Sequence, residues 1–248
     1  MEAQENQAGG HTGRFVQRDG KILKKAKAPE RAFYAFLYSP ELQDEHLIEF
    51  RKFPPAYYGT ETVNGKTHMI LEDLTINYQH ASLLDCKLGR ITYSRDQAQI
   101  KIDHQIAKQA TTTSGSLGFR IAGICIKDDA GNITESWSHH GKHLNINKDN
   151  IYEQFLKAVT RNGQVQPHVI NKFIADTEEI LAWWRKQRSK HFITTSLLYI
   201  NGINGCQTRI VDFSRVYDAE GTEDNNVIEG LENVIRIWHQ VKQVSGLE

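Results

Sequence analysis

The stretch around residue 74 constrains the fold of this chain most, because the sequence changes character there. Short strand-like runs and short helical segments precede it, and the run at 67–71 is typical of a buried strand. Longer amphipathic helical patterns between strand-like runs follow it, the longest at 167–188. We therefore predict an α+β fold of antiparallel sheets with flanking helices, with an N-terminal lobe at 13–74 and a C-terminal lobe at 75–248.

Local signals indicate the elements within each lobe. Asp19-Gly20 lies between two strand-like runs and predicts a hairpin, and Pro29 fits the first turn of a helix that Pro40 ends. Residues 1–12 are polar and aperiodic, and we expect them to be disordered. We expect the other helices at 41–50, 99–108, 147–159, 167–188 and 226–241, a loop at 111–116, and strands at 67–71, 118–126, 192–200 and 208–213.

The composition excludes several classes of protein. Lys plus Arg and Asp plus Glu number 30 each, so no overall field attracts nucleic acid or a membrane surface. The three widely spaced cysteines indicate neither a disulfide framework nor a cysteine-pair zinc site. No apolar run is long enough to span a membrane, and the N-terminus does not resemble a signal peptide. We expect a monomer in the cytoplasm, with the nucleus as a second compartment, that binds neither nucleic acid nor membrane.

The common nucleotide-binding fingerprints are absent. The chain contains neither the glycine-rich P-loop pattern that ends in Lys-Ser/Thr nor the G-x-G-x-x-G pattern of dinucleotide-binding folds. These absences argue against a P-loop enzyme and a Rossmann protein. An anionic ligand must therefore be bound by a local cluster of basic residues.

A D-x-K pair follows the connector between the predicted lobes. Asp85 and Lys87 share one face if they lie on a strand, and Gly89 permits close approach of the backbone. The connector residues Glu72 and Leu74 offer backbone groups with which adenine can pair. The carboxylate can then reach ribose hydroxyls and the lysine a phosphate. The alternative for the isolated pair is a surface ion pair beside a turn.

Three further residues fit a metal and phosphate site. Asp212 ends a strand-like run and, with Phe213, resembles the D-F-G element whose aspartate holds Mg²⁺ in protein kinases. Ser196 can face the same site from the neighbouring strand. Lys24 closes the second strand of the hairpin, where protein kinases keep a lysine for the nucleotide phosphates, and Glu30 can pair with it. The alternatives are a turn aspartate, a core hydroxyl and a surface lysine.

A basic stripe offers donors for a polyanionic substrate. Lys101, His104 and Lys108 recur on one side of the helix predicted at 99–108. A solvated helix face is the alternative explanation of this spacing. Within a substrate-binding segment at 95–120, we expect the stripe to contact phosphates together with Lys87, Arg90 and Arg120.

Taken in order, these segments resemble the inositol polyphosphate kinase family over residues 13–240. The family's P-x-x-x-D-x-K-x-G motif is similar to Ala81-Ser-Leu-Leu-Asp85-Cys-Lys87-Leu-Gly89, and its hinge is similar to Leu71-Glu-Asp-Leu-Thr75. Its later motifs are similar to Thr195-Ser-Leu-Leu198, Val211-Asp-Phe-Ser-Arg215 and Asn226-Val-Ile-Glu-Gly-Leu231. The segment at 109–120 looks most like the inositol hexakisphosphate kinase branch.

The resemblance implies a two-lobed, protein-kinase-like fold and an ATP- and Mg²⁺-dependent inositol phosphate kinase. The expected reaction transfers the γ-phosphoryl group of ATP to inositol hexakisphosphate and gives an inositol pyrophosphate. The alternative is an inositol polyphosphate multikinase that phosphorylates hydroxyl groups of lower inositol phosphates such as inositol trisphosphate. The resemblance assigns adenine to Glu72 and Leu74, ribose to Asp85, nucleotide phosphate to Lys24, substrate phosphate and catalysis to Lys87, and the catalytic metal to Asp212.

Four positions depart from the family pattern. The proline of the first motif is Ala81, and the histidine after the metal aspartate is Arg215, which puts any role of that imidazole in doubt. The tyrosine and phenylalanine of the last motif are Val227 and Glu229. Two other classes compete with a kinase: an inactive phosphate-binding scaffold, which the retained motif residues disfavour, and a single-stranded nucleic acid binder, which the neutral net charge disfavours.

Overall fold

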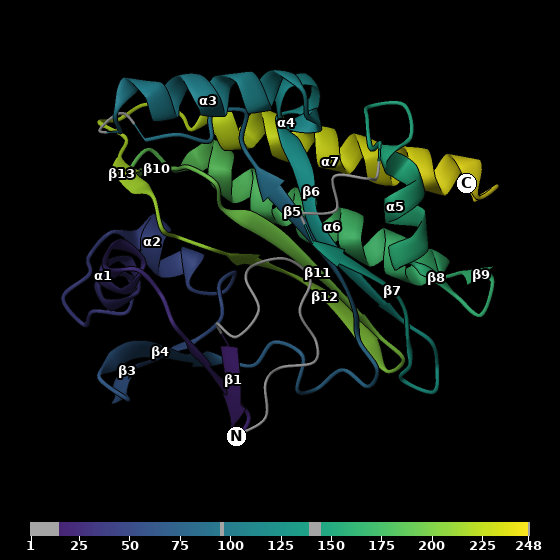
Figure 1. Ribbon diagram of the computed structural model, residues 1–248, viewed down its shortest axis with the longest axis horizontal. Helices are drawn as coiled ribbons and strands as arrows, with labels where there is room; N and C mark the ends of the chain where they lie inside the picture. The colour runs from purple at the N-terminus through teal and green to yellow at the C-terminus, as the bar shows by residue number, and fades with distance from the viewer. Residues whose placement is uncertain (1–14, 95–96, 139–144, 248) are drawn as a thin grey trace.

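Two main antiparallel sheets of unequal size organise the protein (Figure 1). The computed structural model describes residues 15–94, 97–138 and 145–247. In Figure 1, α1 and α2 lie beside the smaller sheet at the lower left of the molecule. The remaining helices lie above the larger sheet. The predicted α+β fold of antiparallel sheets and flanking helices is confirmed.

The smaller sheet has four strands in the order β1-β2-β4-β3. The strands are β1 (Phe15–Arg18), β2 (Lys21–Lys24), β3 (Tyr57–Val63) and β4 (Lys66–Glu72). The predicted hairpin joins β1 to β2, and both turn residues, Asp19 and Gly20, have positive φ angles (51° and 72°), as a tight two-residue hairpin turn requires.

Two helices accompany this sheet. Helix α1 (Ala28–Leu37) has a proline in its first turn, as predicted. Helix α2 (Glu45–Phe50) is shorter than the helix expected at 41–50, because Asp44 caps it: the Asp44 side chain accepts a hydrogen bond from Leu47 N at 3.0 Å.

The larger sheet has five strands in the order β12-β11-β5-β6-β7. They are β5 (Ser82–Leu88), β6 (Phe119–Lys127), β7 (Ile133–Ser138), β11 (Ser196–Gly202) and β12 (Gly205–Val211). The central strand β5 carries the D-x-K pair, and β12, at the edge of the sheet, ends one residue before Asp212.

The two faces of the larger sheet have different surroundings. Leu84, Cys86 and Leu88 of β5 point into the main hydrophobic core. Asp85 and Lys87 alternate with them and therefore point to the opposite face. A smaller hydrophobic cluster, which contains Leu74 from the connector, lies on that second face.

Helices cover the core face of the larger sheet (Figure 1). They are α5 (Ile151–Ala158), α6 (Pro167–Lys186) and α7 (Asn225–Val244). The ring of Trp238 of α7 packs at steep angles against those of Phe155, Phe173 and Tyr199, with centroids 4.7–5.2 Å apart. Such aromatic burial fixes the sheet firmly against the helices.

The remaining elements are short or peripheral. Helix α3 (Gln99–Ala110) and helix α4 (Thr113–Leu117) connect β5 to β6. Two small ribbons pair β8 (Thr160–Arg161) with β9 (Gln164–Val165) and β10 (Lys190–Phe192) with β13 (Val216–Asp218).

Several elements differ from the sequence-based expectation. The strand expected at 192–200 is split into β10 and β11, because Thr194 has a positive φ of 64°, which interrupts extended backbone. Strand β12, expected at 208–213, stops at Val211 for the same reason, since Asp212 has a φ of 67°. Helix α4 replaces most of the loop expected at 111–116, and strands β3 and β7 were not predicted.

Two other expectations concern the ends and the surroundings of the chain. The predicted disordered segment at 1–12 lies outside the described residues. None of the helices in the described part of the chain combines the length and the hydrophobicity that crossing a membrane requires. All strands of the smaller sheet precede residue 74, and all strands of the larger sheet follow it. The exact boundaries of the two lobes stay a prediction.

Candidate active site

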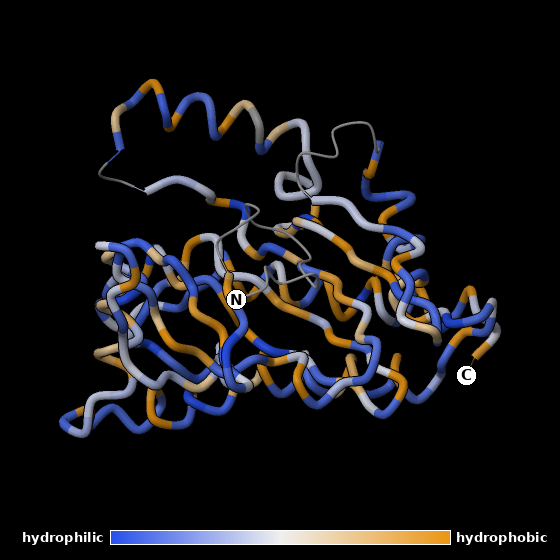
Figure 2. The backbone as a smooth tube through the Cα atoms, turned by 60° about the horizontal axis from the view of Figure 1, so that its bottom comes forward, coloured by the Kyte–Doolittle hydropathy of each residue, from blue (hydrophilic) through white to orange (hydrophobic). Residues whose placement is uncertain are grey.

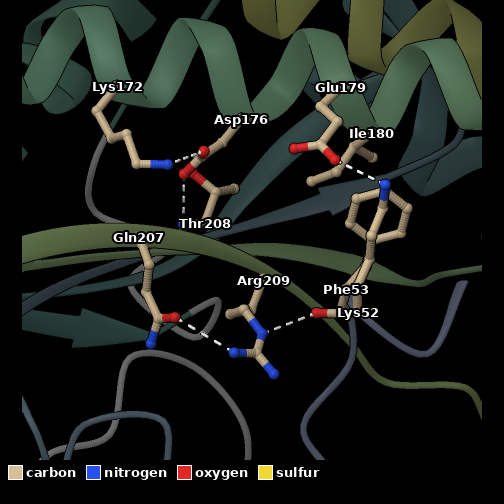
Figure 3. A pocket seen from close by; sticks show the side chains of 9 residues that line it. All are labelled: Lys52, Phe53, Lys172, Asp176, Glu179, Ile180, Gln207, Thr208 and Arg209. Atoms are coloured by element: carbon tan, nitrogen blue, oxygen red, sulfur yellow. Dashed lines mark hydrogen bonds and ion pairs between the residues drawn. The ribbon is translucent and has the colours of Figure 1, made fainter. Parts of the chain in front are cut away.

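Side chains of β12 hold the connector that follows β4. Glu72 Oε2 accepts hydrogen bonds from Ala56 N at 3.1 Å and from Arg209 Nη2 at 2.9 Å. The Leu74 carbonyl accepts one from Gln207 Nε2 at 2.9 Å. Arg209 Nε also donates to Phe53 O at 3.0 Å (Figure 3). The connector is therefore tied to the larger sheet by two residues for which the sequence contained no signal.

A cavity of about 220 Å³ lies beside these two residues (Figure 3). Its charged side chains pair with one another: Lys172 with Asp176, and Lys52 with Glu179 at 2.7 Å. None of the predicted site residues lines this cavity. We therefore regard it as part of the support behind the connector and not as the candidate site.

An apolar patch borders the connector on the second face of the larger sheet. Leu74, Leu83 and Ile200 are buried there, and Leu198 and Val211 pack against them. Leu198 lies opposite Asp85 in the register of β11 with β5. The patch thus joins the connector to the D-x-K strand, and its chemistry suits the flat apolar face of a nucleotide base.

A polar row crosses three strands next to this patch. Lys87 on β5 lies opposite Ser196 on β11 and opposite Arg120 on β6. Residues that are directly opposite in a sheet share one face. The Lys87 ammonium donates to Thr194 O at 3.1 Å, and the Arg120 guanidinium donates to Ser114 Oγ at 2.9 Å. Two cations and a hydroxyl therefore lie side by side on the second face of the larger sheet.

Asp85 is a buried carboxylate beside this row. Asp85 is only 7% exposed, and this burial raises the pKa of its carboxyl to about 6. The positive charge of Lys87 opposes the rise in pKa, and the negative charge of Asp212 adds to it. Within the described part of the chain, neither Asp85 Oδ1 nor the fully buried Ser196 Oγ makes a hydrogen bond of normal geometry, although the Ser196 hydroxyl lies near enough to the Asp85 carboxyl to oppose the rise in its pKa. Buried polar atoms without partners are rare, so both point to a ligand with polar groups.

Lys24 reaches the same place from the smaller sheet. Its Nζ lies 2.6 Å from Glu30 Oε1 and 2.6 Å from Asp212 Oδ1. Burial by itself would lower the pKa of Lys24, but the two carboxylates outweigh it and raise the pKa above its ordinary value. The lysine is therefore held fully charged, and the predicted pairing with Glu30 is confirmed.

Asp212 forms ion pairs with a lysine from each sheet, Lys24 of the smaller and Lys87 of the larger. Its side chain is 40% exposed, and its Oδ2 lies 3.8 Å from Lys87 Nζ while Oδ1 binds Lys24. Its positive φ of 67° is a strained conformation for a residue with a side chain and is typical of functional positions. The strain turns the chain away from β12 at the residue that carries the carboxylate.

The donor set fits a magnesium ion bound mostly through a nucleotide. The described residues contain no cluster of three or more acidic, histidine or cysteine side chains that could hold a metal alone. The partly exposed Asp212 carboxylate and the Ser196 hydroxyl, which lies opposite Val211 in the sheet, are hard oxygen ligands of the kind that Mg²⁺ binds. Mg²⁺ commonly uses one or two carboxylates together with substrate phosphates.

The predicted substrate residues are less uniform. Lys101 and His104 are exposed on α3, and the side chain of Lys108 lies outside the described part of the structure. Arg90 forms an ion pair with Glu229 of α7 and donates to Gly115 O of α4, so it braces two helices. Substrate binding by these four residues stays a prediction.

Comparison with known proteins agrees with this geometry. The family model for inositol polyphosphate kinases matches residues 68–239, which include the connector, the D-x-K pair and Asp212. The chain belongs to the inositol polyphosphate kinase family. The predicted resemblance is thereby confirmed.

Several relatives of the chain are named multikinases. The chain is 27% identical to mouse inositol polyphosphate multikinase over 228 residues, which cover 84% of this chain and 57% of the mouse protein. It is 26% identical to inositol polyphosphate multikinase beta of Arabidopsis thaliana over 287 residues, which cover 98% of this chain and 94% of the plant protein. The chain thus spans little more than half of the mouse relative and nearly all of the plant relative.

Solved structures confirm the fold. The inositol phosphate multikinase Ipk2 of S. cerevisiae, in complex with ADP and Mn²⁺, superposes with a TM-score of 0.73 at 20% identity, covering 90% of this chain and 99% of that chain. A second structure of an inositol phosphate multikinase gives a TM-score of 0.69 at 26% identity, covering 86% of this chain and 99% of that chain.

Proposed function

We propose that this protein is an ATP- and Mg²⁺-dependent inositol phosphate kinase that phosphorylates hydroxyl groups of lower inositol phosphates such as inositol trisphosphate. The observation that carries the proposal is that Lys24 and Lys87, from different sheets, both form ion pairs with Asp212 beside an apolar patch and the connector. Membership of the kinase family supports the reaction class.

The names of the relatives favour this multikinase reaction over the hexakisphosphate kinase that the segment at 109–120 suggested. Both the mouse and the plant relatives are called inositol polyphosphate multikinases. Pyrophosphate formation from inositol hexakisphosphate therefore becomes the second candidate, supported by that segment alone.

The nucleotide would lie between the two sheets. Because Gln207 occupies the Leu74 carbonyl, Leu74 would offer its N–H to adenine, and the Glu72 backbone would complete the pairing. The apolar patch would cover the base, and Asp85, with an unpaired buried oxygen, would accept hydrogen bonds from ribose hydroxyls.

The charged residues would act on the phosphates. Lys24 is held charged and rigid by Glu30, so it can orient the nucleotide phosphates. Lys87 can neutralise charge on the transferred phosphoryl group and on the acceptor, because it faces Asp212 and the polar row. Asp212 and Ser196 would hold Mg²⁺, which supplies charge neutralisation on the phosphates when bound. Phosphoryl transfer of this kind depends mainly on positioning and electrostatics.

The test is to incubate the protein with ATP and each inositol phosphate and to separate the products by charge. We expect turnover of inositol trisphosphate, and Asp212→Asn and Lys87→Ala should each lower kcat by about 100-fold or more. Lys157→Ala, which removes a half-exposed lysine paired with Glu135 at 2.9 Å, serves as the control. Turnover of hexakisphosphate alone would favour the second candidate, and full activity in both site variants would contradict the assigned site.

A further inference from the structure

Arg215 links the loop that carries Asp212 to the chain segment before α3. Its guanidinium Nη1 donates to Thr92 O at 2.7 Å. Its backbone carbonyl accepts a hydrogen bond from Ile193 N at 2.9 Å, which fixes the loop beside β10. A single side chain thus spans from the loop of the proposed metal ligand to the connection between β5 and α3.

The segment that Arg215 reaches is held from several sides. Ile91 N donates to Asn226 Oδ1 of α7 at 2.7 Å, immediately before Thr92. Thr92 itself is only 6% exposed, and its hydroxyl donates to Gln105 Oε1 of α3 at 3.3 Å. Arg215, Thr92 and Gln105 therefore form a continuous connection from the Asp212 loop into the middle of α3.

Within the described part of the chain, helix α3 has few other contacts. It packs chiefly against the short helix α4, and Ile100 and Ile106 are 78% and 45% exposed. Figure 2 shows α3 at the margin of the molecule, with hydrophobic and hydrophilic residues mixed along it. Elements with few buried contacts open more easily than core elements. The position of α3 consequently depends on the connections at its start and on Gln105.

We propose that Arg215 is a positioning residue for the inositol phosphate, because through Thr92 it sets the place of α3 relative to Asp212 and Lys87. The proposal rests on the proposed function, since α3 carries Lys101 and His104, which we expect to contact substrate phosphates. Arginine suits this role: its charge is permanent, its fork is planar, and a hydrogen bond from a charged donor to a buried carbonyl is stronger than a neutral one.

The experiment compares Arg215→Ala and Arg215→Lys with the unaltered protein. We expect Arg215→Ala to raise KM for inositol trisphosphate about tenfold while KM for ATP stays nearly constant, because one charge-assisted hydrogen bond is lost on the substrate side only. Arg215→Lys keeps a charged donor and should recover part of the loss. Arg188→Ala is the matched control, because Arg188 also donates to backbone carbonyls, those of Arg185 and Gln187 at 2.8 Å.

Hydrogen–deuterium exchange of the ligand-free protein provides a readout that does not depend on turnover. Peptides from α3 should exchange faster in Arg215→Ala than in the unaltered protein, while peptides from α6 should not change. Unchanged exchange in α3, or an equal rise of both KM values, would overturn the proposal. If the alanine variant does not fold, the lysine variant decides by the same two measurements.

The failure of the proposed function can be told apart from the failure of this inference. Full turnover in Asp212→Asn would overturn the assigned active site, whatever Arg215 does. Loss of turnover in Asp212→Asn, together with unchanged KM values and unchanged exchange in the Arg215 variants, would overturn only the role of Arg215.

Discussion

At the scale of single residues, burial gives Asp85 its unusual properties. Asp85 is buried opposite Leu198, which packs against the apolar patch, and the pKa of its carboxyl rises to about 6 from an ordinary value of 3.8. A carboxyl with a raised pKa destabilises the folded state once it loses its proton. Asp85 is thus better suited to bind a ligand than to stabilise the fold.

This property predicts a stability change with pH. Between pH 3.8 and about 6 the folded protein keeps the Asp85 proton that the unfolded chain has lost, so the free energy of unfolding falls as the pH rises through this window. Asp85→Asn removes this effect. From about pH 4 to about pH 7, the difference in unfolding free energy should move in favour of the variant by about 2 kcal/mol. Denaturant titrations at both pH values would measure it, and parallel pH profiles would contradict it.

At the scale of elements, β12 serves both ends of the proposed nucleotide site. Gln207 and Arg209 hold the connector, and the strand ends one residue before Asp212. Since a paired strand is stiff along its length, the connector and Asp212 keep a constant separation. The position of the base and the position of the phosphates are therefore coupled through one strand.

We predict that Arg209→Ala impairs nucleotide binding selectively. The change leaves Glu72 and the Phe53 and Pro54 carbonyls without their guanidinium partner, so KM for ATP should rise about tenfold or more while KM for the inositol phosphate stays nearly constant. Steady-state kinetics with each substrate varied would show it. Arg185→Ala, which removes an exposed ion pair with Glu232, is the control. This pattern is the reverse of that expected for Arg215→Ala, and a rise in the inositol phosphate KM alone would refute it.

At the scale of the whole molecule, Lys24 joins the two sheets. It comes from β2 of the smaller sheet, and its two partners are Glu30 of α1 and Asp212 beyond β12 of the larger sheet. The Lys24 and Glu30 side chains are 9% and 6% exposed, so their charges have little access to water. Removing one member of such a pair leaves the other buried and uncompensated.

A double-mutant cycle tests this link. Lys24→Met should lower the free energy of unfolding by about 3 kcal/mol, because Glu30 stays buried without its cation. Adding Glu30→Gln removes the uncompensated charge, so the double variant should be more stable than Lys24→Met alone. Denaturant titrations of the four proteins would give the coupling free energy. Strictly additive losses would show that the pair does not act as a unit.

Sequence alone determined the features that depend on near neighbours. The Asp19-Gly20 turn, the long helices and the shared face of Asp85 and Lys87 follow from residue type and from periodicities of two and 3.6 residues. The order of motifs along the chain was sufficient to predict the family, because it does not require coordinates.

Tertiary structure decided the features that depend on residues far apart in the chain. Lys24 and Asp212, 188 positions apart, come within 2.6 Å only after both sheets have formed. Packing between distant segments likewise produces the raised pKa of Asp85 and two hydrogen bonds, from Arg209 to the Glu72 carboxylate and from Arg215 to the Thr92 carbonyl. Local patterns carry no information on such pairings, because burial and electrostatics depend on all the elements that surround a residue.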